Sequence, residues 1–386
     1  MKHRSQRFVS VPNVHMRNSS VEVLRIFAVF TLLFTHLLLL DLKQSPDVSM
    51  RIVTAFLSQL GGVGDDLFFG ISAWFLCVEH APNLKRNCRR VWILERQLLF
   101  YSLLPLILVL SAQFVLHVQV FESSRAVYGA VIHSVFPTIS SLWWYPTAYI
   151  IFLLIHPMLD RGLRSLGEHG HGMLALVLLA VWGVLPGQSY GMGLSVVLFV
   201  FIYVLVSYVR WYRDRWVRSS RIGRNAILTG LLIGGVPMLI AAIANQSFSY
   251  LNDPAKLPSL LISFGILSAA ARGRETHSRI VNAIASCSLT VYILPGYPQV
   301  FGGIWKVIYT VTGEYRSMPW LMLAANIGII IAVFLGSVAV DLIRQRLFAW
   351  TVDRNKGAWF ALLWHRAEHW LTTRRTDAST DTSTRL

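Results

Sequence analysis

The sequence predicts an all-α polytopic membrane protein, and three observations carry that prediction. Hydrophobic residues make up 54% of the 386 residues and charged residues only 14%, whereas an average soluble domain has about 25% charged residues. The apolar residues are grouped in runs long enough to cross a bilayer. Lys and Arg are concentrated in alternate loops. We therefore expect about ten transmembrane helices with both termini in the cytoplasm.

The first apolar run, Val21–Leu40, organises the rest of the chain. At a rise of 1.5 Å per residue it reaches about 30 Å, which is the thickness of the hydrocarbon core. Ser19 and Glu22 have the S-x-x-E spacing of a capping box, so the helix is expected to start near Ser20. Nine further spans are predicted at 58–78, 91–115, 142–159, 172–190, 193–211, 226–245, 257–272, 283–305 and 319–344.

The distribution of basic residues predicts the orientation. With the N-terminus inside, 27 of the 35 Lys and Arg residues fall in inner segments and six in outer segments, while Arg25 and Arg96 lie within spans. Cytoplasmic loops carry such an excess. The net charge of +16 is thereby explained by topology, and no nucleic-acid partner is expected.

Three segments depart from regular spans. Segment 116–141 is predicted to be an external loop with a short re-entrant or interfacial helix. Ser288–Trp305 contains Pro295 and Gly296, so it is expected to be broken and to line protein or a cavity. The expected parts of the chain are a cytoplasmic tail (1–20), the transmembrane domain (21–345), an interfacial amphipathic segment (346–371) and a disordered polar tail (372–386).

Several kinds of site are not indicated. Three cysteines are too few for a disulfide framework or a metal cluster. The histidines lack metal-ligand spacing, so no metal site is expected. The sequence also contains no G-x-S-x-G, phosphate-loop, H-E-x-x-H or dinucleotide motif.

The first span contains three ionisable residues: Glu22, Arg25 and His36. Glu22 and Arg25 can pair across one turn. Arg25 and His36, eleven residues apart, lie on one helix face, about 20° apart around the axis and about 16 Å apart in depth. Arg25 alone could reach the inner interface, and His36 alone could bond a neighbouring helix. Their alignment favours a functional site, because ionisable residues within a membrane usually mark pathways or chemistry.

Asp65 and Asp66 open the second predicted span, in the outer half of the membrane, at the depth expected for His36. A carboxylate beside a histidine raises its basicity and fixes its tautomer, which suits a general base acting on a hydroxyl. The alternative is that one of them caps the helix, where the dipole favours a carboxylate.

These residues resemble a known family. Arg25 and His36 form an R-x10-H pattern like that opening the acyltransferase-3 superfamily of integral membrane O-acyltransferases. Val63–Phe75 resembles the family's G-V-D-L-F-F-x-x-S-G-(Y/F) stretch, with Asp66 at the aspartate. Leu142–Tyr145 followed by Ile155–Leu159 is similar to its W-F/Y…P-x-L segment. The likeness covers roughly residues 17–345.

The resemblance implies roles for particular residues. His36 and Asp66 are the expected catalytic pair. Basic groups on the inner side would hold the phosphates of a nucleotide-bearing donor, although the positive-inside rule accounts for most of them. These donor-binding candidates are Arg25, Arg86, Arg89 and Arg96, the middle two resembling the family's R-x-x-R element. Further site candidates are Glu22, Asp65, Ser72, Trp143, Trp144 and Tyr292.

Two departures from the family pattern are present. Pro295 stands where many members have a late histidine, and Ala73 stands where glycine is usual. They leave open an altered acceptor or a catalytically silent member.

The resulting expectation is an O-acyltransferase of the plasma membrane. It would move an acyl group, most simply acetyl from acetyl-CoA or another acyl-CoA, to a hydroxyl of a cell-surface or lipid-linked glycan. The expected partners are membrane lipid, the glycan acceptor and acyl-CoA, without a tightly bound cofactor, and an oligomer stays open. The main alternative is a transporter of glycans or lipid-linked intermediates, because broken helices and intramembrane charges also occur in carriers.

Overall fold

The computed structural model describes residues 18–79, 82–185, 195–246, 248, 250–354 and 358–369. In this part of the chain every regular element is helical, so the all-α prediction is confirmed. The elements are α1 (Ser19–Leu37), α2 (Leu40–Lys43), α3 (Val48–Gln59), α4 (Gly61–Leu76), α5 (Leu84–Phe114), α6 (Ser124–Val135), α7 (Trp144–Ser165), α8 (Gly167–Leu178), η1 (Leu179–Val184), α9 (Ser195–Tyr212), α10 (Asp214–Arg218), α11 (Ser220–Gly230), η3 (Leu231–Gly235), α12 (Val236–Ile243), α13 (Leu257–Arg272), α14 (Arg279–Ser286), α15 (Ser288–Ile293), α16 (Pro298–Gly313) and α17 (Pro319–Trp350).

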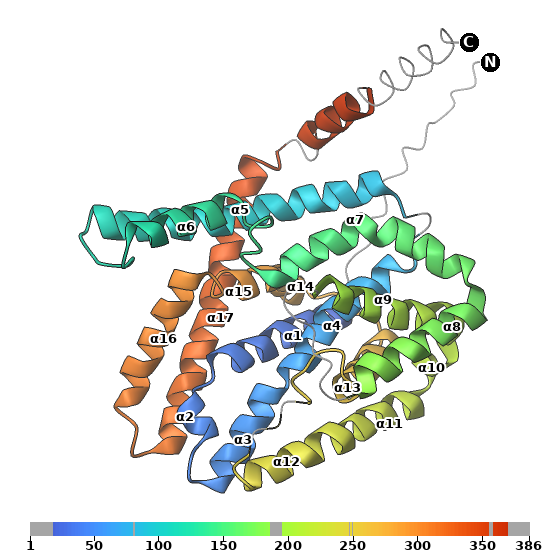
Figure 1. Cartoon of the computed structure of the whole chain (residues 1–386), viewed down its shortest axis with the longest axis horizontal. Helices are drawn as coiled ribbons and strands as arrows, with labels where there is room; N and C mark the ends of the chain where they lie inside the picture. Colours follow the sequence, from blue (N-terminus) through green and yellow to red (C-terminus); the bar gives the residue numbers. More distant parts are fainter. Residues whose placement is uncertain are drawn as a thin grey trace, which may run out of the picture.

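Helix α1 lies in the middle of the bundle (Figure 1) and packs against α3, α4, α13, α14, α15 and α17. It ends at Leu37, three residues before the predicted end of the span. The capping residue also differs from the prediction: the Asn18 side chain accepts from the backbone N–H of Ser20 at 3.0 Å. The Ser19 hydroxyl instead donates to Asn282 Oδ1 at 2.8 Å, because the start of α1 is buried against the start of α14.

The loops gather into two sets that match the predicted sides. On one side, the backbone N–H of Ser19 donates to Thr276 O at 2.8 Å, and Arg272 donates to Val217 O at 2.7 Å. On the other side, Arg51 donates to Ala242 O at 2.7 Å. The grouping agrees with the predicted topology. Which side is cytoplasmic stays a prediction.

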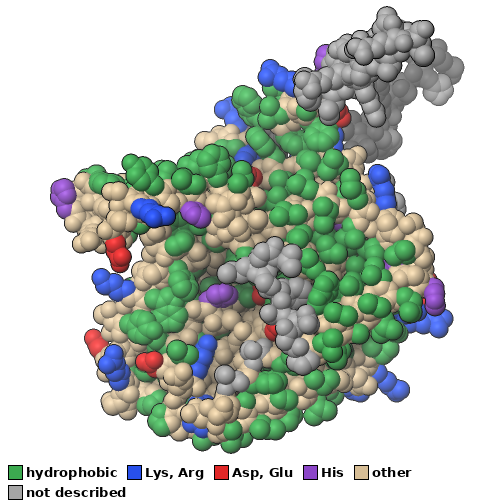
Figure 2. Space-filling model, in the orientation of Figure 1, with side chains coloured by type: hydrophobic (Ala, Val, Ile, Leu, Met, Phe, Trp, Pro, Cys, Tyr) green, Lys and Arg blue, Asp and Glu red, His purple; other side chains and the backbone are tan. Residues whose placement is uncertain are grey.

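Four helices in the described part are long and apolar enough to cross a membrane: Ser19–Leu37, Leu84–Phe114, Ser220–Ile243 and Pro319–Trp350. Val196–Tyr212 and Leu257–Arg272 are shorter apolar helices. Hydrophobic side chains cover much of the face in Figure 2, and most charged side chains there lie at its margins. These features are those of a membrane protein. The full count of ten spans stays a prediction.

The irregular segments partly follow the prediction. The predicted span 283–305 is broken into α14, α15 and α16, and the chain turns at Leu294–Tyr297, as its Pro and Gly residues indicated. Segment 116–141 contains the short helix α6. Helix α17 continues to Trp350, beyond the predicted end of the membrane domain at residue 345.

Candidate active site

A cavity of about 250 Å³ opens beside α1 and brings together residues from distant parts of the chain. Val29, Leu32, Leu33 and His36 supply the α1 wall. Opposite them, the cavity is lined by four more residues named from the sequence: Trp143, Trp144, Tyr292 and Pro295. His36 is therefore the basic side chain of a largely aromatic and apolar pocket.

The hydrogen bond of His36 fixes which ring nitrogen can act as a base. His36 Nδ1 lies 2.8 Å from the carbonyl oxygen of Leu32, one turn earlier in α1. A carbonyl can only accept, so Nδ1 carries the proton in that bond. In the neutral imidazole, Nε2 then keeps a free lone pair. The His36 side chain is exposed, which leaves Nε2 available to a substrate hydroxyl.

The break after α15 shapes the opposite wall. A Cβ on Gly296 would lie 3.0 Å from Tyr292 O and 3.4 Å from Trp143 Nε1. Glycine at this position therefore lets the Trp143 indole approach the broken helix closely. The indole N–H of Trp143 is buried and has no hydrogen-bond partner in the described part of the chain.

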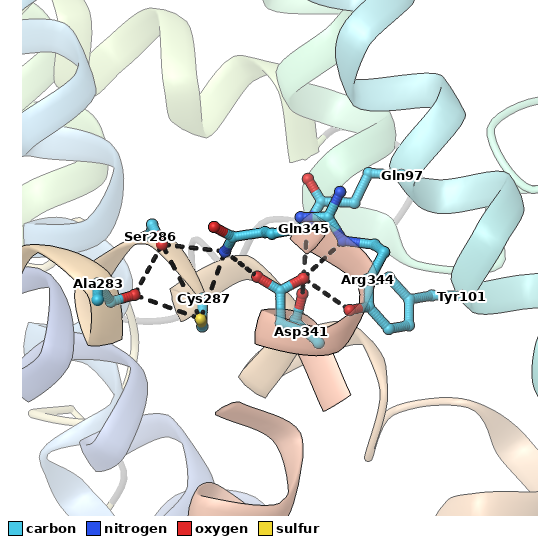
Figure 3. A network of polar contacts seen from close by, with 9 residues as sticks. Gln97, Tyr101, Ala283, Ser286, Cys287, Asp341, Arg344 and Gln345 are labelled. Carbon is cyan, nitrogen blue, oxygen red and sulfur yellow. Dashed lines mark hydrogen bonds and ion pairs between the residues drawn. The ribbon is translucent and has the colours of Figure 1, made fainter. Parts of the chain in front are cut away.

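A buried polar network holds α15, and therefore Tyr292, in place (Figure 3). Its centre is Asp341 of α17, which is fully buried. Thr290, two residues before Tyr292, donates to Asp341 Oδ1 at 2.7 Å. The other donors to this carboxylate are Tyr101 OH at 2.6 Å, Arg344 Nε at 2.7 Å and Gln345 Nε2 at 2.7 Å. Asp341 is not among the site residues predicted from the sequence, although an aspartate within an apolar span is a signal for a functional residue.

Arg25 lies below the cavity on the same face of α1. It pairs with Glu22 at 2.6 Å, as its spacing predicted. Glu22 is buried, and its second oxygen has no hydrogen-bond partner in the described residues. Because Val29 follows Arg25 by four residues, the α1 wall of the cavity begins about one turn above the guanidinium. A molecule bound at Arg25 would reach the cavity by extending about one turn along α1.

Polar side chains continue from Arg25 toward the cavity. Arg25 is a neighbouring charge of the phenol groups of Tyr145 and Tyr149, and Ser72 lies beside Tyr149. The ring of Tyr145 lies 6.0 Å from the ring of Tyr292. Tyr145 is therefore a neighbour of Tyr292, which lines the His36 cavity.

The comparison with protein families agrees with this geometry. A family described as "Acyltransferase domain" matches residues 18–342, which include the whole site. The chain belongs to the acyltransferase-3 family. It is therefore a membrane acyltransferase, and the resemblance of its motifs is confirmed. No curated protein and no solved structure matches the chain.

The two aspartates of this acyltransferase face different neighbours. Helix α4 begins at Gly61, so Asp65 and Asp66 lie inside it and neither caps it. Asp66 Oδ1 accepts from the backbone N–H of Ala255 at 2.8 Å. Asp65 is a neighbouring charge of the phenol groups of Tyr145 and Tyr292. Because consecutive helical residues are about 100° apart, only one can face the cavity side.

The predicted pairing of Asp66 with His36 is therefore not seen in the described residues. The Nδ1 partner of His36 is Leu32 O, and the resolved contact of Asp66 is with the loop before α13. Asp65, the second aspartate named as a site candidate, is the carboxylate near Tyr292.

The basic candidates on α5 already have partners or lie at the surface. Arg86 is 3.5 Å from Glu79, and Arg89 is exposed. Arg96 forms an ion pair with Asp353 at 2.8 Å. Its neighbour Glu95 accepts a hydrogen bond from the Thr138 hydroxyl. Of the four arginines, Arg25 is the one on the helix face that forms the cavity.

Proposed function

We propose that this membrane acyltransferase transfers an acetyl group from acetyl-CoA to a hydroxyl of a cell-surface or lipid-linked glycan at the plasma membrane. The observation that carries the proposal is the free Nε2 of His36 in a small pocket, on the face of α1 that also carries Arg25. A general base, an anchor for an anionic donor and an apolar pocket are the parts that acyl transfer to a hydroxyl requires.

The donor would lie along α1. Eleven residues separate Arg25 from His36, which is about 16 Å of helix. The phosphates of CoA would bind near Arg25 through charge-assisted hydrogen bonds. The pantetheine arm would run past Tyr149 and Tyr145 and bring the thioester to the cavity. The cavity volume of about 250 Å³ favours a short acyl group over a long chain.

The reaction then needs a single base. His36 Nε2 takes the proton of the acceptor hydroxyl as its oxygen attacks the thioester carbonyl carbon. The tetrahedral intermediate collapses, the C–S bond breaks, and the imidazolium returns its proton to the departing CoA thiolate. The products are an acetyl ester and CoA. General-base assistance of this kind contributes about 10²–10⁴-fold in rate.

The acceptor would enter from the side of Trp143 and Trp144. Aromatic side chains offer broad flat surfaces with a polar edge, which suit a sugar ring beside a membrane. Pro295 stands in the wall where many relatives have a histidine, so the acceptor hydroxyl would depend on His36 alone for deprotonation.

The test is a comparison of surface and lipid-linked glycans by mass spectrometry. Cells lacking the protein are compared with cells that carry the parent chain or the His36→Gln variant. We expect an alkali-labile acetyl ester only with the parent chain. Identical glycans in all three strains, with the protein present in the membrane, would contradict the proposal.

A further inference from the structure

A second and larger cavity lies on the other side of α4. It has a volume of about 630 Å³ and shares no lining residue with the His36 cavity. Helices α4, α8, η1, α9, α10, α11 and α13 line it, and its walls are almost entirely apolar. A Cβ on Gly70 of α4 would meet nothing within 4 Å. The space is therefore open along this face of α4.

The length of this cavity matches one leaflet of a bilayer. Asp66, Gly70 and Trp74 line it at successive turns of α4. Eight residues of helix span about 12 Å, and half of the hydrocarbon core is about 15 Å thick. The end at Trp74 lies on the predicted inner side, because α4 runs from the outer to the inner loops.

At that end the apolar cavity continues into a polar one of about 440 Å³. The two share Gly172, Leu176 and Tyr208, and the polar cavity adds Glu168, His169 and Arg213. An apolar trench about as long as one leaflet is thick therefore adjoins a more polar pocket on the predicted inner side.

Two arginines stack on aromatic rings around this junction. The Arg210 guanidinium lies 4.2 Å from the ring centre of Trp74. Arg213 lies 5.1 Å from the ring centre of Tyr208 and 5.7 Å from that of Trp216. Trp74 and Trp216 both line the apolar cavity. This combination of aromatic rings and cations is typical of the membrane interface.

The charges at this end favour an anion. Arg213 forms an ion pair with the half-exposed Glu168 through one guanidinium nitrogen. The other N–H groups of the Arg213 guanidinium can donate to a ligand. Arg210 Nε is buried and has no hydrogen-bond partner in the described residues. A phosphate could accept from the remaining donors of Arg213 while a hydrocarbon chain fills the trench.

We propose that this groove binds one anionic phospholipid from the leaflet on the side of loops 160–171 and 210–225. An acyl chain lies along Gly70 between α4 and α13, and the phosphate binds Arg213 in the adjoining polar pocket. The site does not depend on the transfer reaction, because it shares no residue with the His36 cavity.

The test measures lipid retained by the purified full-length protein in native mass spectrometry. The probes are phosphatidylglycerol and phosphatidylcholine with identical acyl chains. Gly70→Leu fills the trench. Its matched control is Gly328→Leu on α17, where a Cβ likewise meets nothing within 4 Å. Thermal unfolding of each variant in detergent alone verifies that it is folded.

We expect the parent and Gly328→Leu to retain phosphatidylglycerol, and Gly70→Leu to retain about tenfold less. Arg213→Gln should remove the preference for phosphatidylglycerol, whereas the exposed Arg221→Gln should keep it. Equal retention by Gly70→Leu and the parent would overturn the proposal, as would a parent without preference for the anionic lipid. Displacement of the lipid by acetyl-CoA would also overturn it, by assigning the polar pocket to the donor.

Discussion

The two faces of α4 differ in what they offer a ligand. Asp65 lies near the phenols of Tyr145 and Tyr292, and Tyr292 lines the small cavity that also contains His36. The other face carries Asp66, Gly70 and Trp74 along a wide apolar trench. The first is suited to chemistry, because polar groups are held in fixed positions. The second is suited to retaining hydrocarbon. One helix thus separates a reaction site from a lipid groove by a rotation of about 100°.

The difference also lies in how each region is held. Behind the His36 cavity, buried hydrogen bonds to Asp341 fix α15. Around the trench, the contacts are mainly van der Waals contacts between helices, which tolerate small shifts. Precise geometry is needed where a proton moves, and much less where a chain is accommodated.

The largest expected effect is that of Asp341→Asn. The change removes the charge of the fully buried Asp341 that compensates the largely buried Arg344, and breaking a buried pair from one side costs about 3–5 kcal/mol. We expect a clearly lower thermal unfolding temperature in detergent, together with lost transfer activity, because α15 carries Tyr292.

Asp214→Asn is the matched control for Asp341→Asn. Asp214 pairs with Arg218 at the surface, with 46% and 80% of the two side chains exposed. Surface pairs contribute about 0–1 kcal/mol. Equal unfolding temperatures for the two variants would show that the Asp341 network does not hold the cavity wall.

The second prediction separates the two faces of α4 directly. Asp65→Asn should reduce the transfer rate about tenfold, because it removes the carboxylate beside the tyrosines of the reaction side. Asp66→Asn should leave the rate nearly unchanged, since its resolved hydrogen bond is to the loop before α13. Initial rates with purified protein at saturating acetyl-CoA measure both. A rate loss confined to Asp66→Asn would restore the pairing predicted from the sequence.

The smallest effect concerns the donor. Arg25→Gln should weaken acetyl-CoA binding several-fold, by about the 0.5–1.5 kcal/mol that a hydrogen bond contributes after exchange with water. Arg96→Gln should change the affinity little, because Arg96 is already paired with Asp353. Equilibrium binding of acetyl-CoA to the purified variants measures this difference. A stronger loss in Arg96→Gln than in Arg25→Gln would place the donor on α5.

Local sequence patterns predicted the parts of this molecule that depend on neighbouring residues. The periodicity of α1 placed Arg25 and His36 on one face, and the prolines and glycines after Ser288 predicted the broken helix. The family motifs identified Trp143, Trp144 and Tyr292, which the structure brings to one cavity with His36.

Features that depend on packing between distant helices could not be predicted. Tyr101 and Asp341 are 240 residues apart in the chain, and Arg96 and Asp353 are 257 apart. No local pattern specifies such a pair. The different neighbours of Asp65 and Asp66 could not be predicted for the same reason: a rotation of α4 by one residue exchanges them. The trench at Gly70 likewise exists only because several helices distant in the chain leave space there.

The most direct measurement for the central claim is the transfer rate of purified His36→Gln beside that of purified His133→Gln. His133 is an exposed histidine on α6, outside the cavity. The account predicts that His36→Gln loses about 10²–10⁴-fold in rate and still binds acetyl-CoA, while His133→Gln keeps the parent rate. A His36→Gln protein that transfers acetyl at the parent rate would contradict the account.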